Sequence, residues 1–172
     1  MSKNTITYFR KSYGFFKELE EYLKGKKVLE IFSGNGFLAK ELSDRGIEVK
    51  STSLFSGHDG HTNGMNFEVE ELSAVDAVKK YGQEYDFLLM SWPVVGPWAL
   101  EAIEVWGEEK PVIYIGEAPR PELPGLAGLP GCASDEFFES ITWEKVFSSY
   151  QGNILERAGV IRWSGYAPEK GD

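Results

Sequence analysis

Apolar residues follow two patterns that alternate along the chain. Short runs of apolar and β-branched residues are typical of buried strands, whereas apolar residues three or four positions apart mark one face of a helix. The strand-like runs are KKVLEIF, IEVKSTS, YDFLLMSW and KPVIYIGEA, at residues 26–32, 47–53, 85–92 and 110–118. The helical spacing occupies residues 12–24, 37–46, 73–81 and 97–107. The pattern therefore predicts strands and helices in regular alternation.

Repeated strand–helix alternation predicts an α/β fold, with a mostly parallel sheet between two layers of helices. Near the end of the chain, two strand-like runs at residues 142–150 and 159–166 predict an antiparallel pair, and residues 134–140 predict a short helix. A further short strand is predicted at residues 66–70. No repeat or Ser/Gly-rich linker interrupts the sequence, so we expect a single domain over residues 1–172.

Composition places the chain among globular proteins. Apolar residues make up 42% and charged residues 26% of the 172 residues, a balance unlike that of disordered chains. No apolar stretch approaches the ~20 residues of a membrane span, and the N-terminal residues lack the apolar core of a secretory signal. Cys132 is the single cysteine, so no internal disulfide can form. We expect a protein of the reducing cytoplasm without contact with membranes.

Charge is spread unevenly along the sequence. The formal net charge is −9, with +3 in residues 1–50 and −12 in residues 51–172. Surfaces that bind long nucleic acids need a stripe of basic residues, because neutralising phosphates supplies most of the non-specific affinity. Long duplex DNA is therefore an unsuitable partner, whereas a nucleotide, a small cation or a basic protein segment is compatible with this charge. Solubility is the simplest reason for the acidic excess.

Ligands of parallel sheets bind beyond the C-terminal ends of the strands. Four segments follow predicted strands directly and are candidates for such a site: Ser33–Gly36, Ser53, Ser91–Pro93 and Gly116–Glu117. This places candidate binding residues from distant parts of the sequence at one edge of the sheet.

The most informative of these segments lies in VLEIFSGNG. Gly34 and Gly36 stand between a predicted strand and a predicted helix, where the absence of a Cβ allows a sharp turn and the close approach of a ligand. Glu30 lies near the end of the strand, four positions before Gly34. A carboxylate at this point would attract a cationic group of the ligand.

The spacing E-x-x-x-G-x-G at Glu30, Gly34 and Gly36 resembles the first motif of the class I methyltransferases that use S-adenosylmethionine, and the preceding LKGKKVLEI is similar to that family's first strand. The resemblance extends over roughly residues 20–118. It implies a Rossmann-like three-layer fold and S-adenosylmethionine as the cofactor. The glycine turn, with Ser33, would hold the methionine end of the cofactor, and the acidic residue would help to fix its amino group.

Two segments depart from the pattern of that family. Ser53 stands at the end of the second strand, where the family has an Asp or Glu that holds the ribose hydroxyls; a hydroxyl makes fewer such hydrogen bonds than a carboxylate. After the fourth strand, members that methylate amino groups have Asn, Asp or Ser followed by Pro-Pro and an aromatic residue, and this chain reads SWPV. The resemblance thus places Ser91 and Trp92 near the transferred methyl without defining the target atom.

Glu117 follows the fifth strand and could act as a general base or attract a cationic substrate. We therefore predict Ser91, Trp92 and Glu117 as catalytic residues, and Glu30, Ser33, Gly34, Gly36 and Ser53 as cofactor-binding residues. The predicted function is methyl transfer to a small molecule or to a short exposed element of a macromolecule. The sequence indicates neither the acceptor nor an oligomeric state.

Several alternatives stay open at this point. The glycines also satisfy G-x-G-x-x-G/A, the motif of nicotinamide-dinucleotide sites, although the acidic ribose ligand expected about 20 residues later is again replaced by Ser53. The alternative from another class is a non-catalytic protein that keeps the turn as a scaffold, or binds the cofactor without transferring its methyl, and binds a basic partner through its acidic surface. Trp92 could pack in the core or in a lid, and Glu117 could be a solvated strand end.

Two further groups have simpler explanations. His58 and His61 form HDGH, but a fixed metal site needs three or four ligands, and no other histidine exists in the chain. A polar loop is the simpler interpretation of this segment, and no metal is predicted. Cys132 has no histidine near it in sequence, which favours a buried, unreactive thiol over a nucleophile.

Overall fold

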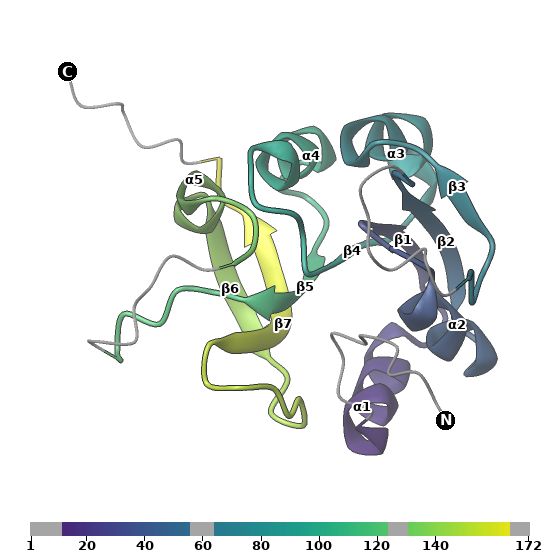
Figure 1. Ribbon diagram of the computed structural model, residues 1–172, viewed down its shortest axis with the longest axis horizontal. Coiled ribbons are helices and arrows are strands. Elements are labelled where there is room, and N and C mark those ends of the chain that lie inside the picture. Colours follow the sequence, from purple (N-terminus) through teal and green to yellow (C-terminus); the bar gives the residue numbers. More distant parts are fainter. Residues whose placement is uncertain (1–11, 56–63, 124–130, 166–172) are drawn as a thin grey trace.

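A computed structural model describes residues 12–55, 64–123 and 131–165, and His58 and His61 lie outside these ranges. Seven strands of the described chain form one sheet (Figure 1). The strands are β1 (Lys27–Ile31), β2 (Glu48–Ser53), β3 (Val69–Glu71), β4 (Phe87–Ser91), β5 (Val112–Glu117), β6 (Ile141–Val146) and β7 (Glu156–Trp163). The helices are α1 (Tyr13–Leu23), α2 (Phe37–Asp44), α3 (Ala74–Tyr81), α4 (Trp98–Trp106) and α5 (Asp135–Glu139), with a 3₁₀ turn η2 (Gly82–Glu84). The predicted alternation of strands and helices is confirmed.

The strand order across the sheet is β3-β2-β1-β4-β5-β7-β6. Strands β1 to β5 pair in parallel, and β7 runs antiparallel to both of its neighbours, β5 and β6. The predicted antiparallel pair at the end of the chain is therefore confirmed. The sequence did not predict that β7 would lie between β5 and β6, since a strand-like pattern does not name the strand's partners.

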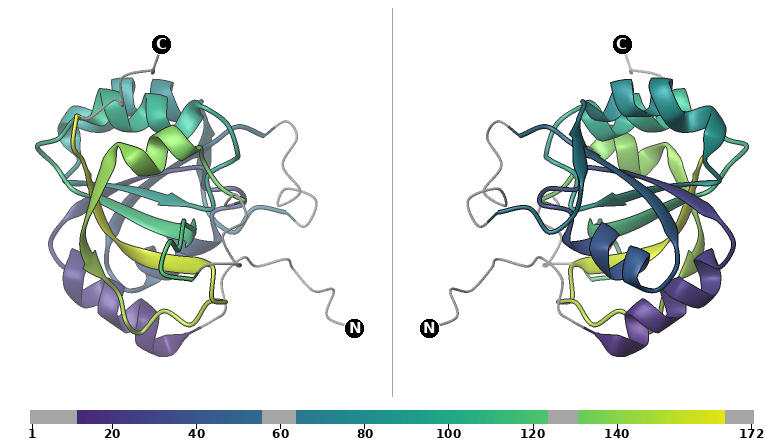
Figure 2. Two further views of the ribbon diagram at one scale, coloured as in Figure 1. Left: turned by 90° about the vertical axis from the view of Figure 1, so that its left-hand side faces the viewer. Right: turned by 90° about the vertical axis from the view of Figure 1, so that its right-hand side faces the viewer.

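Helices cover both faces of the sheet, as predicted. Figure 2 shows α3, α4 and α5 on one face and α1 and α2 on the other. Each face has its own apolar core, because successive side chains of a strand point to opposite faces. In β1, Leu29 and Ile31 pack toward α3 and α4, whereas Val28 packs with the apolar residues of α1 and α2. Trp106 is buried on the α4 side together with Ile103.

Serine side chains fix the starts of three helices. Ser12, Ser73 and Ser134 each accept a hydrogen bond from a backbone N–H in the first turn of α1, α3 and α5, which satisfies one of the unpaired donors at a helix start. Helix α4 ends at Gly107, which adopts φ 89°, a value that glycine reaches without strain. Across the described ranges, no helix is both long enough and apolar enough to span a bilayer.

Candidate functional site

The candidate site lies where the path of the chain changes direction in the sheet. Strand β1 is flanked by β2 on one side and by β4 on the other. From β1 the chain moves outward to β2 and β3, and it then returns across β1 to add β4 and β5. Such a switch point leaves a crevice beyond the C-terminal ends of the two central strands, where α/β proteins bind their ligands. Residues 32–36 and 92–96 directly follow β1 and β4.

The two glycines of the turn have different surroundings. Gly36 adopts φ 79° at the start of α2, and a Cβ placed there would lie 2.7 Å from the Cβ of Phe67. Gly34 adopts φ 59°, and no atom of the described residues lies within 4 Å of the position its Cβ would take. Packing therefore explains the glycine at position 36, whereas Gly34 borders open space that a ligand can enter.

Hydroxyl groups at the end of β2 hold the glycine turn in place. The Gly34 N–H donates to Ser53 Oγ at 3.3 Å, and Ser51 Oγ donates to Ser33 Oγ at 2.6 Å. Thr52 Oγ1 donates to the carbonyl of Glu30 at 2.9 Å. The Ser53 hydroxyl also donates to the carbonyl of its neighbour Leu54 at 3.3 Å. The run STS of β2 thus positions the turn, and the predicted contact of Ser53 with a ribose stays a prediction.

Glu30 is the most unusual polar residue of the site. It has no exposed surface, and neither carboxyl oxygen has a hydrogen-bond partner among the described residues. Burial raises the pKa of this carboxyl to about 8, while the nearby Ser33 hydroxyl acts in the opposite direction. A buried carboxyl in this state is ready to accept a cationic hydrogen-bond donor, which would remove the cost of leaving it unpaired.

The β4 and β5 ends meet at Trp92 and Gly116. The Trp92 N–H donates to the carbonyl of Ile115 at 2.7 Å, and a Cβ on Gly116 would lie 3.4 Å from the Cα of Trp92. Trp92 packs against both apolar cores, and Ser91 is buried at the end of β4. The structure therefore brings the predicted SWPV and Gly116–Glu117 segments side by side.

Backbone strain in the described chain gathers at this edge. The non-glycine residues with positive φ are Phe32 at 57°, Trp92 at 50° and Ala133 at 53°. Phe32 directly follows β1 and Trp92 directly follows β4, while Ala133 exchanges backbone hydrogen bonds with Pro93 and Gly96. Left-handed backbone is costly for residues with a Cβ and is concentrated at functional sites in proteins. Sequence reasoning did not identify Phe32 or Ala133, because neither residue type predicts a positive φ.

Glu117 is half-buried at the C-terminal end of β5. Its carboxylate accepts a hydrogen bond from the Gly131 N–H at 2.5 Å, and its backbone carbonyl accepts one from the Tyr114 hydroxyl. The carboxylate therefore ties Gly131, ahead of α5, back to the sheet. Its predicted role as a general base is untested by this geometry.

Cys132 is buried beside Tyr114 and Gly116. The predicted burial of the thiol is confirmed, and burial raises its pKa, which disfavours the reactive thiolate. Among the residues that the structure describes, no group of three or more His, Cys, Asp or Glu could hold a metal ion.

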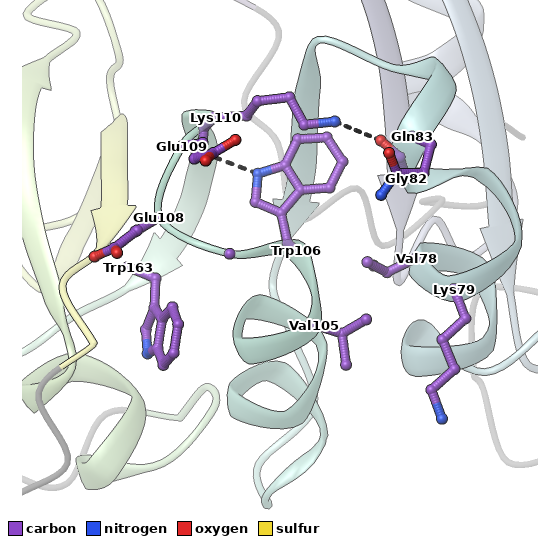
Figure 3. A pocket seen from close by; sticks show the side chains of 11 residues that line it. Val78, Lys79, Gly82, Gln83, Val105, Trp106, Glu108, Glu109, Lys110 and Trp163 are labelled. Carbon is purple, nitrogen blue, oxygen red and sulfur yellow. Dashed lines mark hydrogen bonds between the residues drawn. The ribbon is translucent and has the colours of Figure 1, made fainter.

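A separate cavity of about 580 Å³ lies at the opposite edge of the sheet (Figure 3). It is lined by residues at the ends of α3 and α4 and by Trp163 at the end of β7. The Lys110 ammonium lies 4.1 Å from the ring centroid of Trp106 and donates to the carbonyl of Tyr85 at 2.7 Å. This lysine is therefore already satisfied by the protein. The cavity contains none of the predicted site residues.

Comparisons with known proteins give information on the fold alone. No family model matches the chain, and no curated protein is similar to it in sequence. Among solved structures, a variant of MtNAS in complex with S-adenosylmethionine is 15% identical, with a TM-score of 0.53, over 88% of this chain and 62% of its own. The chain thus spans less than two thirds of MtNAS. The ribosomal protein L11 methylase of Lactobacillus delbrueckii subsp. bulgaricus is 15% identical, with a TM-score of 0.52, over 87% of this chain and 77% of its own.

The fold is that of the class I methyltransferases. A methyltransferase fold does not by itself define the chemistry. A protein of Rhodobacter sphaeroides described as a zinc-dependent alcohol dehydrogenase is 12% identical to the chain, with a TM-score of 0.58, over 90% of this chain and 91% of its own. The strand order nevertheless differs from the 3-2-1-4-5-6 order of classic dinucleotide-binding folds, because β7 lies antiparallel between β5 and β6.

Proposed function

We propose that the protein is a methyltransferase that uses S-adenosylmethionine. One observation supports this most strongly: a buried, unpartnered carboxyl at Glu30 lies at the end of β1, next to a glycine turn with open space at Gly34. S-adenosylmethionine has a positively charged amino group at one end, which suits such a carboxyl. The relative MtNAS, which shares the fold, is bound to this cofactor.

The chain's own residues would hold the cofactor as follows. Glu30 would accept hydrogen bonds from the amino group, and the turn Ser33–Gly36 would lie along the methionine end. Ser53 would act as a positioning residue, because its hydroxyl accepts the Gly34 N–H. When bound, S-adenosylmethionine supplies a methyl group on a cationic sulfur. The task of the protein is then to orient the acceptor in line with that methyl and to exclude water.

The acceptor would enter beside Ser91, Trp92 and Glu117. Just beyond them, the loop 93–97 and the first residue of α4 expose three large apolar side chains: Val94 at 42%, Val95 at 60% and Trp98 at 48%. Two backbone hydrogen bonds tie this loop to residue 133: the Gly96 N–H donates to the carbonyl of Ala133 at 2.9 Å, and the Ala133 N–H donates to the carbonyl of Pro93 at 3.1 Å. Neighbouring exposed apolar residues are typical of a binding surface. They favour an acceptor with an apolar or planar face.

The charge of the residues next to this loop further limits the chemical class of the acceptor. Glu101 lies in the first turn of α4, and residues 91–101 contain no lysine or arginine, so this segment offers no positive charge that would attract an anionic substrate. We therefore propose an uncharged or cationic small molecule, or a short exposed macromolecular segment of the same chemistry. The buried free thiol of Cys132 is compatible with a reducing compartment such as the cytoplasm.

Two measurements test this function. Calorimetric titration should show saturable binding of S-adenosylmethionine and of its demethylated product S-adenosylhomocysteine, and no binding of NAD at the same concentrations. Incubation with candidate acceptors should then produce S-adenosylhomocysteine only when an acceptor is present. Cofactor binding without turnover on any acceptor would instead indicate a non-catalytic binding protein, and preference for NAD would overturn the assignment.

A further inference from the structure

Glu30 has no positively charged partner among the described residues. Its register partners are Ser51 on β2 and Leu89 on β4, and neither is charged. Burial and the Ser33 hydroxyl are the influences on its pKa, and no charged side chain of the described residues contributes. The carboxyl oxygens also accept no hydrogen bond from any described group. Among the described residues, the Ser33 hydroxyl is therefore the one group that favours the carboxylate, and burial outweighs it.

A carboxyl in such surroundings prefers its neutral form. Moving an isolated carboxylate out of water costs far more free energy than protonating it near neutral pH, so buried acids without partners hold their proton. An ammonium group brought next to the carboxyl reverses this preference, because a nearby cation within hydrogen-bond distance stabilises the charged form.

We propose that Glu30 is protonated in the free protein and releases its proton to solvent when the ammonium group of S-adenosylmethionine binds beside it. This inference rests on the proposed function. The exchange is balanced: the O–H bond of the carboxyl breaks, one proton passes to water, and the carboxylate formed accepts a hydrogen bond from the ligand's N–H. No electrons are transferred. Cofactor binding is thereby coupled to pH through a single residue.

The coupling has a defined pH dependence. Because the pKa of Glu30 is about 8 in the free protein, about nine in ten molecules hold the proton at pH 7. Each protonated molecule must lose this proton when the cofactor binds. The affinity for the cofactor should therefore rise about tenfold from pH 7 toward pH 9. Proton release should be about 0.9 per ligand at pH 7 and should fall below about 0.3 at pH 8.5.

Calorimetry of the full chain can count the protons. S-adenosylhomocysteine is titrated at one pH into buffers with different ionisation enthalpies, and the slope of the observed enthalpy gives the number released. Methylthioadenosine, which lacks the amino-acid end, is the matched ligand control and should release no proton at Glu30. Glu30→Gln is the matched protein control: it keeps the size of the side chain without the titratable proton, so it should bind more weakly and release none.

The outcomes separate this inference from the function on which it rests. Binding of S-adenosylhomocysteine without proton release at pH 7 would overturn the proton exchange and leave the proposed function standing. Equal proton release by Glu30→Gln would assign the proton to another group and would also overturn it. Failure of the wild-type protein to bind either ligand would overturn both proposals.

Discussion

At the scale of single residues, Glu30 should make the free protein less stable as the pH rises. The pKa of its carboxyl is about 8 in the folded protein, whereas the ordinary value of 4.5 applies to the unfolded chain. The folded state therefore binds the proton more tightly than the unfolded state. The free energy of unfolding should therefore fall between about pH 4.5 and pH 8 and stay level above that range.

The variant Glu30→Gln tests this pH dependence, because the amide has no proton to lose. Its melting temperature should exceed that of the wild type by an amount that grows from pH 5 to pH 8, and thermal unfolding followed by circular dichroism measures this. Glu104→Gln, at an exposed position of α4, is the control for removing one negative charge. A constant difference between Glu30→Gln and wild type at every pH would contradict the protonation of Glu30.

Gly34 and Gly36 should respond differently to the same substitution. Asparagine tolerates left-handed backbone better than other residues with a Cβ, so Gly34→Asn and Gly36→Asn differ mainly in what the new side chain meets. At position 36 it meets Phe67, and overpacking of this kind costs about 1–3 kcal/mol. At position 34 it enters open space and should lower cofactor affinity at least about tenfold with little change in melting temperature.

Thermal unfolding and calorimetric titration of both variants check this prediction. Loss of stability in Gly34→Asn equal to that in Gly36→Asn would show that the turn is purely structural. The sequence alone could not distinguish the roles of the two glycines, because the contact that sets Gly36 apart is made by Phe67, about thirty residues later in the chain.

The contacts of Ser53 were likewise beyond prediction. Its position at the end of a strand could be predicted from the pattern IEVKSTS, but its partner, the Gly34 N–H, lies 19 positions away in sequence. Only the parallel pairing of β1 with β2 brings the two together. The position of Glu30 near the end of a strand and before a glycine turn could be predicted, because it is a local feature of the sequence.

At the scale of elements, two substitutions of Glu117 should distinguish its structural contact with Gly131 from a role in catalysis. The Glu117→Gln variant keeps an oxygen that can accept the Gly131 N–H, so its melting temperature should stay within about 2 °C of wild type. If the carboxylate attracts or deprotonates the acceptor, turnover should fall by about 100-fold or more with cofactor affinity unchanged. Glu117→Ala, which also removes the tether, should lose stability as well. Wild-type turnover in Glu117→Gln would remove Glu117 from the catalytic residues.

Element types were predictable where element partners were not. The strand-like run at residues 159–166 correctly predicts β7, because β-branched and apolar residues dominate it. Its insertion between β5 and β6 depends on pairing along β5, from Val112 with Ile161 to Glu117 with Glu156. No local pattern encodes that choice. The same holds for the positive φ of Trp92, whose N–H donates to the carbonyl of Ile115 in β5.

At the scale of the whole molecule, cofactor binding should stabilise the fold. A ligand that binds only the folded state adds about 2.7 kcal/mol at 100 times its dissociation constant, which for a chain of this size corresponds to a rise of about 5–10 °C in melting temperature. S-adenosylhomocysteine should produce this rise in a thermal-shift assay, and NAD should not. An absence of any shift at saturating S-adenosylhomocysteine would contradict the cofactor assignment.

The two separate edges of the sheet allow the most direct test of the account. A crystal structure of the complex with S-adenosylhomocysteine should show the ligand's amino group about 2.7–3.2 Å from a Glu30 carboxyl oxygen and its amino-acid end beside Gly34. The cavity that Trp106 and Trp163 line at the other edge should be free of this ligand. Density for the ligand in that cavity, with none at the glycine turn, would contradict the central claim that Glu30 and Gly34 form the cofactor site.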